Sequence, residues 1–152
     1  MVRGLEVRKA TIDDIEKLAV LFDGYRQFYE QPSNLEKAHS FLLDRLQLNE
    51  STVFIALNDS GEGVGFTQLY PMFSSVRMRR IWILNDLFVS PTARKQGVGA
   101  ALMQAATAFA TSQGAAGLEL ATAKDNTSAK SVYEALGWEM DTEFDHYSIT
   151  IK

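Results

Sequence analysis

The residues with the clearest capacity for chemistry form a short basic loop rich in glycine. Arg94 and Lys95 precede Gly97 and Gly99, and the loop follows an apolar run that ends at Val89. Apolar residues then recur at helical spacing, which predicts that the loop stands at a helix N-terminus. The first N–H groups of a helix lack intrahelical partners and carry the positive end of its dipole. The loop is therefore suited to an anion such as a diphosphate, the alternative being a turn whose glycines serve geometry alone.

Two common phosphate-binding loops differ from this one. Leu102 stands where the dinucleotide fingerprint needs a small residue, and no Gly-Lys-Ser/Thr follows as in nucleoside triphosphate loops. The spacing Arg94-x-x-Gly97-x-Gly99 after Leu-Phe-Val-Ser-Pro resembles instead the acetyl-CoA loop of the GCN5-related N-acetyltransferase (GNAT) superfamily. The preceding Leu-Asn-Asp-Leu-Phe-Val is similar to the Leu-Glu-Asp-x-Tyr/Phe-Val strand of its diamine, polyamine and histone acetyltransferase-like branch.

The resemblance implies that acetyl-CoA binds at this loop. The backbone groups of Leu87, Phe88 and Val89 would hold the pantetheine arm in the manner of an added strand. The residues implied at the diphosphate are Arg94, Lys95, Gln96, Gly97, Val98, Gly99 and Ala100.

A second motif lies near the C-terminus and is also similar to the family. The resemblance implies that Asn126, Ser128 and Ala129 contact the pantetheine arm and that Tyr133 lies beside the thioester sulfur. A phenol with a pKa of ~10 stays protonated at neutral pH and can donate to a departing thiolate whose conjugate acid titrates near ~8.5. Tyr133 is therefore the candidate general acid. The alternative is a tyrosine that packs on the apolar face of its helix.

The attacking amine requires a base, because an alkylammonium with a pKa near ~10.4 must lose a proton before it can attack. The resembled branch has a glutamate at the position of Asn85, whose amide cannot accept that proton. Asp86 is the preferred candidate base, with Glu119 second and a water-mediated route also open. Asp86 could instead orient the strand or the helix start. Asn85, Tyr25 and Tyr29 are candidates for the acceptor site, and the alternative for the two tyrosines is helix packing in the core.

The elements that must position these residues follow from hydrophobic periodicity and from breakers. The patterns predict strands over 5–9, 52–57, 64–70, 79–89, 117–123 and 143–151, helices over 11–29, 35–46, 99–112 and 126–136, and a turn over 71–78. This order predicts a mixed α/β fold, with a mostly antiparallel sheet of six to seven strands and about four helices on its two faces. The resemblance implies that the strands ending at Val89 and starting at Gly117 splay apart to form the acetyl-CoA cleft.

Composition limits the classes of protein that fit. At 152 residues the sequence predicts a single domain over 1–152. The absence of cysteine excludes disulfides, thiolate metal sites and a cysteine nucleophile, and no metal is expected. A net charge of −4 argues against nucleic-acid binding.

No apolar run approaches the ~20 residues of a membrane span and no signal peptide is evident, so a cytoplasmic protein without a membrane partner is expected. The C-terminal strand resembles one exchanged between subunits in the branch, which implies a homodimer.

The predicted function is transfer of an acetyl group from acetyl-CoA directly to a primary amine. The acceptor could be a small amine, a diamine or polyamine, an amino acid or a protein lysine. Two alternatives remain: a non-catalytic module that binds or senses acyl-CoA, which Asn85 favours and Tyr133 opposes, and a purely structural domain.

Overall fold

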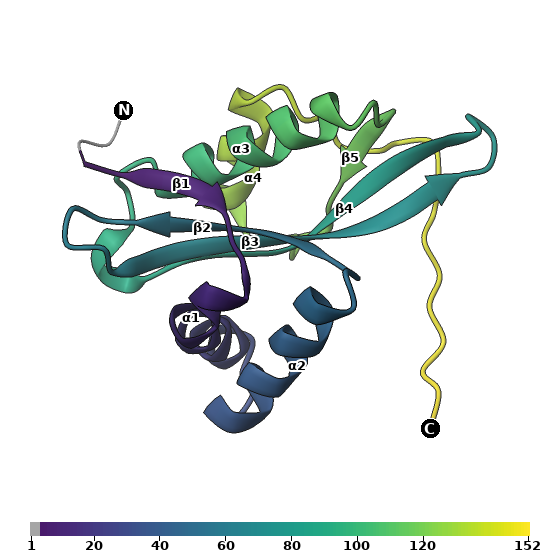
Figure 1. Cartoon of the computed structure of the whole chain (residues 1–152). Coiled ribbons are helices and arrows are strands. Elements are labelled where there is room, and N and C mark those ends of the chain that lie inside the picture. Colours follow the sequence, from purple (N-terminus) through teal and green to yellow (C-terminus); the bar gives the residue numbers. More distant parts are fainter. Residues whose placement is uncertain (1–3) are drawn as a thin grey trace. The chain divides into compact units, whose positions relative to one another are not determined.

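The computed structural model describes residues 4–152, which divide into two compact units. The first unit ends at Ala121 and the second spans Thr122–Lys152. The strands, all in the first unit, are β1 (Glu6–Lys9), β2 (Thr52–Leu57), β3 (Gly63–Ser74), β4 (Arg79–Val89) and β5 (Gly117–Glu119) (Figure 1). The helices are α1 (Ile15–Phe28), α2 (Leu35–Gln47), α3 (Val98–Ser112) and, in the second unit, α4 (Thr127–Ala135). None of the described helices is long and apolar enough to cross a membrane.

The sheet is mixed, as the element order predicts. Its five strands follow the order β1-β2-β3-β4-β5; β1 to β4 are antiparallel, and β5 runs parallel to β4. The β4–β5 pairing covers only Ile81 to Ile83, which face Gly117 to Glu119. Over the described residues, β4 from Leu84 to Val89 therefore has no strand partner on the β5 side. This is the splayed arrangement that the family resemblance implies.

The predicted strands need two corrections near the C-terminus. The described residues form five strands rather than six or seven, because 143–151 is not a strand. In addition, β5 ends at Glu119 instead of continuing to 123. Alternating apolar residues such as Tyr147, Ile149 and Ile151 fit a strand, but a strand also needs a partner to satisfy its backbone groups. No described residue pairs with this segment.

The predicted turn over 71–78 is also too long. Strand β3 continues through Pro71 to Ser74, where it pairs with β4, and only 75–78 form the turn. Pro71 is tolerated because β2 pairs with β3 only as far as Leu69, so that side of β3 needs no ladder hydrogen bond beyond this point.

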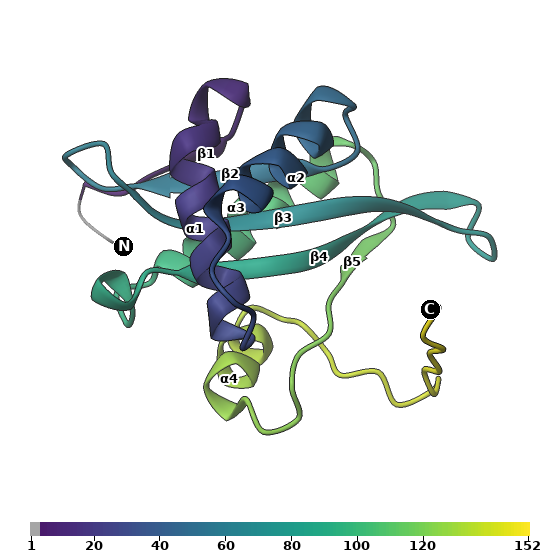
Figure 2. The same ribbon diagram turned by 90° about the horizontal axis from the view of Figure 1, so that it is seen from below.

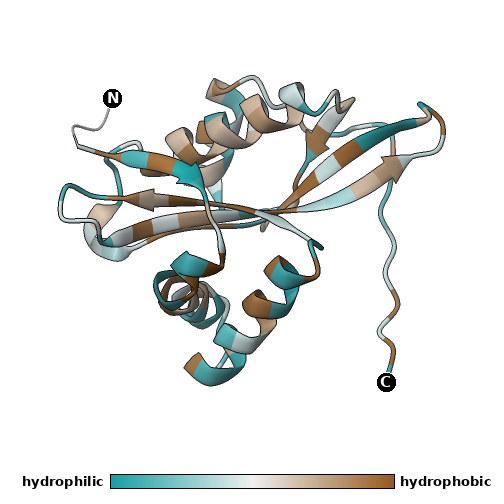
Figure 3. Cartoon of the chain, viewed as in Figure 1, coloured by the Kyte–Doolittle hydropathy of each residue, from teal (hydrophilic) through white to brown (hydrophobic). Residues whose placement is uncertain are grey.

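Helices cover both faces of the sheet within the first unit. Figures 1 and 2 show α1 and α2 on one face and α3 on the other. Figure 3 shows apolar residues along the central strands and along α3. The core between the sheet and α1–α2 includes Leu18, Phe22, Leu42, Ile55 and Phe66, of which all but Phe22 are completely buried.

The N-terminal end of α1 is held by local hydrogen bonds. A 3-10 turn (Ile12–Asp14) precedes the helix and carries a capping box between Thr11 and Asp14. Asp14 also accepts two hydrogen bonds of 2.8 Å from the guanidinium of Arg8 on β1. The Arg8 hydrogen bonds hold the pKa of the Asp14 carboxyl below its usual range. These bonds fix the start of α1 against the first strand.

Candidate active site

The basic loop adopts the geometry of an anion-binding turn. After β4, a second 3-10 turn (Pro91–Ala93) leads into the loop, and α3 begins at Val98. Gly97 is the N-cap of α3 with a φ of 83°, a conformation that favours glycine, and it has no side chain that could cap the helix. A Cβ on Gly99 would meet only the side chain of Val89, at 3.8 Å. The first N–H groups of α3 are therefore uncapped by side chains, and the donor set fits a diphosphate.

Two side chains of the loop, Arg94 and Gln96, bond back to the residues that precede it. Arg94 turns back toward the strand, where its Nε donates to the carbonyl oxygen of Val89 at 2.9 Å. Gln96 donates to the carbonyl oxygen of Thr92 at 3.4 Å. Lys95 has a φ of 63°, unusual for a residue with a side chain, which shows how tightly the loop bends.

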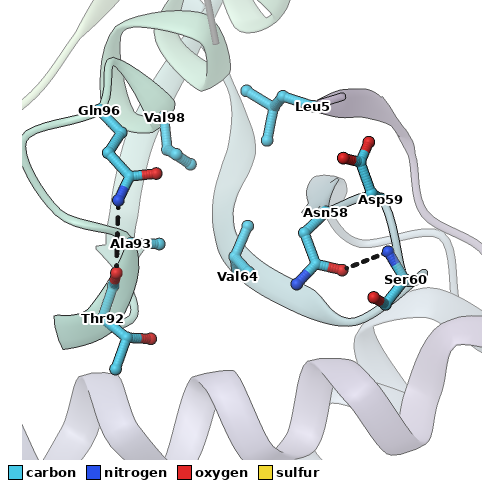
Figure 4. Close-up of a pocket in the computed structure, with 9 residues that line it drawn as sticks. All are labelled: Leu5, Asn58, Asp59, Ser60, Val64, Thr92, Ala93, Gln96 and Val98. Carbon is cyan, nitrogen blue, oxygen red and sulfur yellow. Dashed lines mark hydrogen bonds between the residues drawn. The ribbon is translucent and has the colours of Figure 1, made fainter. Parts of the chain in front are cut away.

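A pocket of about 280 Å³ lies beside the loop on the side of the β2–β3 turn (Figure 4). Its lining residues are Leu5, Asn58, Asp59, Ser60, Val64, Thr92, Ala93, Gln96 and Val98. Gln96 and Val98 are the only predicted site residues among them. The pocket thus borders the cofactor loop but does not include the candidate base or the candidate acceptor residues.

Strand β4 contains a β-bulge next to the candidate base. Gln68 of β3 pairs with Asp86, whereas the next residue, Leu69, pairs with Leu84. Asn85 is therefore the extra residue, and a bulge of this kind re-aims the neighbouring side chains. As a result Asn85 is exposed, while Asp86 is only 2% exposed.

The buried carboxylate of Asp86 is held by two amide donors. The Nδ2 of Asn85 donates to its Oδ1 at 2.7 Å, and the Nε2 of Gln68 donates to its Oδ2 at 2.6 Å. Ser51 extends the network by donating to the Oε1 of Gln68 at 2.8 Å. Burial raises the pKa of Asp86 above its usual range, while the hydrogen bonds from Asn85 and Gln68 oppose that shift. The nearby hydroxyl of Tyr25 also acts to lower the pKa of Asp86.

Two half-buried tyrosines lie close to Asp86. The hydroxyl of Tyr25 on α1 donates to the carbonyl oxygen of Asn85 at 3.2 Å, and burial followed by the charge of Asp86 raises its pKa. The same two causes raise the pKa of Tyr70 on β3 to about 12. The ring of Tyr29 lies beside that of Tyr25, with 5.1 Å between centroids and a tilt of 60° between the ring planes. The structure thus brings together Tyr25, Tyr29, Asn85 and Asp86, the candidates for the acceptor side.

Sequence reasoning missed Gln68, Tyr70 and Ser51 as partners of this site. One signal was available, because Gln68 and Tyr70 carry polar groups and are two positions apart in one strand. Residues two apart point to the same face of a strand, so this pair already marked a polar position on a buried face. Glu119, the second candidate base, is exposed at the end of β5.

The second unit carries the other motif. Asn126 is the N-cap of α4, and its side chain accepts a 3.4 Å hydrogen bond from the N–H of Ala129. Ser128 and Ala129 lie in the first turn of this helix. Tyr133 is half-buried on α4, with its ring centroid 6.4 Å from that of Trp138. None of the residues of α4 is fully buried.

The sequence gives no reason to expect a metal site, and the described side chains can be searched for one. Among the described residues, no group of three or more His, Cys, Asp or Glu could hold a metal ion. His39 lies near Glu16, and His146 lies near Asp141.

A basic glycine loop at the uncapped start of α3 follows the strand that carries a buried carboxylate, an arrangement that suits a protein with a phosphate-bearing cofactor. The model of the Acetyltransferase (GNAT) family matches residues 18–138, which include most of the first unit and part of the second. The chain belongs to the GNAT family and is an N-acetyltransferase. Members of this family use acetyl-CoA.

Individual relatives agree with this assignment. The uncharacterized N-acetyltransferase YhfO of Bacillus subtilis (strain 168) is 48% identical over 147 residues, which cover 97% of this chain and 98% of the relative. The crystal structure of a probable acetyltransferase is 40% identical, with a TM-score of 0.92, and covers 97% of this chain and 98% of that one. An aminoglycoside N-acetyltransferase in complex with CoA shares the fold, with a TM-score of 0.77 at 24% identity, over 97% of this chain and 95% of that one.

Proposed function

We propose that the chain transfers an acetyl group from acetyl-CoA directly to a primary amine. One observation carries the proposal: β4 holds a buried carboxylate at Asp86 and, three residues after it, leads from Val89 into the uncapped start of α3. We therefore assign the base for the amine to this strand and the diphosphate site to the helix start that follows it. The acceptor is a small amine, a diamine or polyamine, an amino acid or a protein lysine.

The cofactor assignments rest on the loop and on the open side of β4. Leu87, Phe88 and Val89 lie in the part of β4 that has no described strand partner on the β5 side, so their backbone groups are suited to the pantetheine arm. The segment from Arg94 to Ala100 is assigned to the diphosphate. Asn126, Ser128 and Ala129 are assigned to the pantetheine arm by their motif. Acetyl-CoA supplies the activated acetyl thioester, and no metal is needed.

Asp86 is proposed as the base that takes the proton of the ammonium group, directly or through one water. Its raised pKa makes it a better proton acceptor than an exposed aspartate, because a base works best when its pKa approaches the working pH. Asp86 takes one proton before the attack. The nitrogen–carbon bond then forms as the carbon–sulfur bond breaks, and the second proton that the nitrogen must lose passes to solvent. Tyr25 and Asn85 border the point where the amine would enter, and Tyr29 extends the aromatic wall.

Tyr133 is proposed as the acid that protonates the departing thiolate. Its motif assigns this role, and a phenol is chemically suited to it because it is protonated at neutral pH. The two protons that the ammonium group loses thus go to Asp86 and to solvent, and the thiolate receives one from Tyr133, whose phenolate regains a proton from solvent.

The test is the release of CoA thiol from acetyl-CoA with a panel of diamines, polyamines, amino acids and lysine peptides. We expect Tyr133→Phe and Asp86→Asn each to lower kcat by about 100-fold, the usual contribution of one general acid or base. Ser112→Ala, at the far end of α3, is the control and should retain full activity. Binding of acetyl-CoA without turnover on any amine would contradict the proposal and favour the sensing module.

Two further sequence predictions belong to this proposal. We expect a homodimer, which light scattering coupled to size-exclusion chromatography would measure as twice the mass of 16.9 kDa. We also expect the protein to act in the cytoplasm, which cell fractionation would test.

A further inference from the structure

The guanidinium of Arg94 lies near two aromatic rings from different elements. Its Cζ is 5.6 Å from the ring centroid of Phe88 on β4 and 5.7 Å from that of Phe28, the last residue of α1. Both distances are within the range of cation–π attraction. The Nε hydrogen bond to Val89 adds a third point of attachment.

Phe28 is an unusual residue to find at this position. It is 58% exposed, so burial in the core does not explain a large aromatic side chain here. Its ring makes a T-shaped contact with Tyr29, at 5.3 Å between centroids, and faces Arg94. Phe88, by contrast, is partly buried and packs against the core cluster. Packing in the core therefore explains the aromatic side chain of Phe88 but not that of Phe28.

This arrangement leaves part of the guanidinium available. Arginine has five N–H donors in one rigid plane, and the bond to Val89 uses only the Nε donor. The Nη1 and Nη2 groups of Arg94 make no hydrogen bond to any residue from 4 to 152. A guanidinium held in one orientation loses less conformational freedom when it binds a phosphate than one that moves freely.

We propose that Phe28 is a positioning residue for the cofactor: its ring, together with Phe88 and the Val89 carbonyl, orients Arg94 so that its Nη groups meet the diphosphate of acetyl-CoA. The inference rests on the proposed function of the loop and deepens it. The C-terminal end of α1 would then have two roles. Tyr25 and Tyr29 would serve the acceptor amine, and Phe28 would serve the cofactor.

The test measures the binding of CoA by isothermal titration calorimetry, independently of turnover. We expect Phe28→Ala to raise the Kd for CoA about fivefold, within the range of an exposed cation–π contact, and Phe28→Tyr to keep the Kd within about twofold of the original. Phe28→Leu, which keeps apolar bulk without an aromatic ring, should resemble Phe28→Ala. Val20→Ala is the matched control, because Val20 is on the same helix, is 60% exposed and lies outside the site.

A second probe separates the diphosphate from the rest of the cofactor. Pantetheine lacks the diphosphate, so its Kd, followed by ligand-observed NMR, should be the same for Phe28→Ala and the original protein. In an Arg94→Ala background, Phe28→Ala should have little additional effect on CoA, because the two residues act through one contact.

Three outcomes would overturn the inference. If Phe28→Ala weakens CoA and pantetheine equally, the residue supports α1 in general and not Arg94. If Arg94→Ala weakens CoA but Phe28→Ala does not, the aromatic contact has no role and the proposed function stands. If the unaltered protein binds no CoA at all, the proposed function fails and the inference fails with it.

Discussion

Asp86 combines a buried position with two amide donors, and their balance determines how its charge responds to pH. Burial disfavours the ionised form and raises its pKa, whereas Gln68 and Asn85 donate to the ionised form and lower it. Gln68 is itself completely buried and oriented by Ser51. The base proposed for the reaction is therefore tuned by a residue on the neighbouring strand.

This balance predicts the effect of Gln68→Leu on the pH profile. Loss of the Gln68 donor removes a stabiliser of the carboxylate, so the pKa of Asp86 rises further. Because the base must be ionised to accept a proton, the acidic limb of kcat/KM moves to higher pH, by about one unit for a hydrogen bond to a charged group. The measurement is the pH–rate profile with saturating acetyl-CoA. Gln113→Leu, at the exposed end of α3, is the control, and an unmoved limb in Gln68→Leu would show that Asp86 is not the titrating base.

At the scale of elements, Gly65 determines how closely α3 approaches the sheet. It lies in β3 opposite Val89, at the end of β4 that leads into the loop. A Cβ there would come within 2.9 Å of the carbonyl oxygen of Phe88 and 3.2 Å of side-chain atoms of Val98 and Leu102. The start of α3, and with it the basic loop from Arg94 to Gly99, can lie where it does because this position has no side chain.

We therefore expect Gly65→Ala to destabilise the protein by about 1–3 kcal/mol, the usual cost of overpacking. The cause is a contact with backbone, which cannot move aside as a flexible side chain would. Thermal unfolding followed by circular dichroism would measure the loss. Gly117→Ala in β5 is the control, since its Cβ would meet only the end of Arg77, at 3.8 Å. Equal stability of the two variants would show that α3 adjusts without cost.

At the scale of the whole molecule, the free energy of folding depends strongly on the core between the sheet and the α1–α2 pair. Leu42 of α2 is 0% exposed and belongs to this core. Leu42→Ala should lower the free energy of unfolding by about 2–5 kcal/mol, because it leaves a cavity in a closely packed region. Chemical denaturation would measure the loss. Leu48→Ala, just after the same helix and 65% exposed, should change stability by less than about 0.5 kcal/mol. Similar losses in both variants would contradict the placement of the core.

The sequence by itself determined the features that depend on neighbouring residues in the chain. The position of the loop from Arg94 to Gly99 at a helix start could be predicted, because a loop suited to an anion needs glycine and positive charge at fixed short spacing. The capping box at Thr11 and the four helices were readable for the same reason, since caps and helical periodicity are local. The family followed from such local motifs. The roles of Tyr133 and Asp86 remain predictions.

Only the tertiary structure decided the features that depend on residues far apart in the chain. The bulge at Asn85 arises from the register between β3 and β4, which no local pattern specifies, and it determines that Asp86 is buried while Asn85 is exposed. The pairing of Asp86 with Gln68 depends on that same register. The contact of Arg94 with Phe28 forms because packing places the end of α1 beside the loop. Such contacts depend on how elements dock, and docking is decided by the shape and burial of side chains throughout the core, not by any single stretch of sequence.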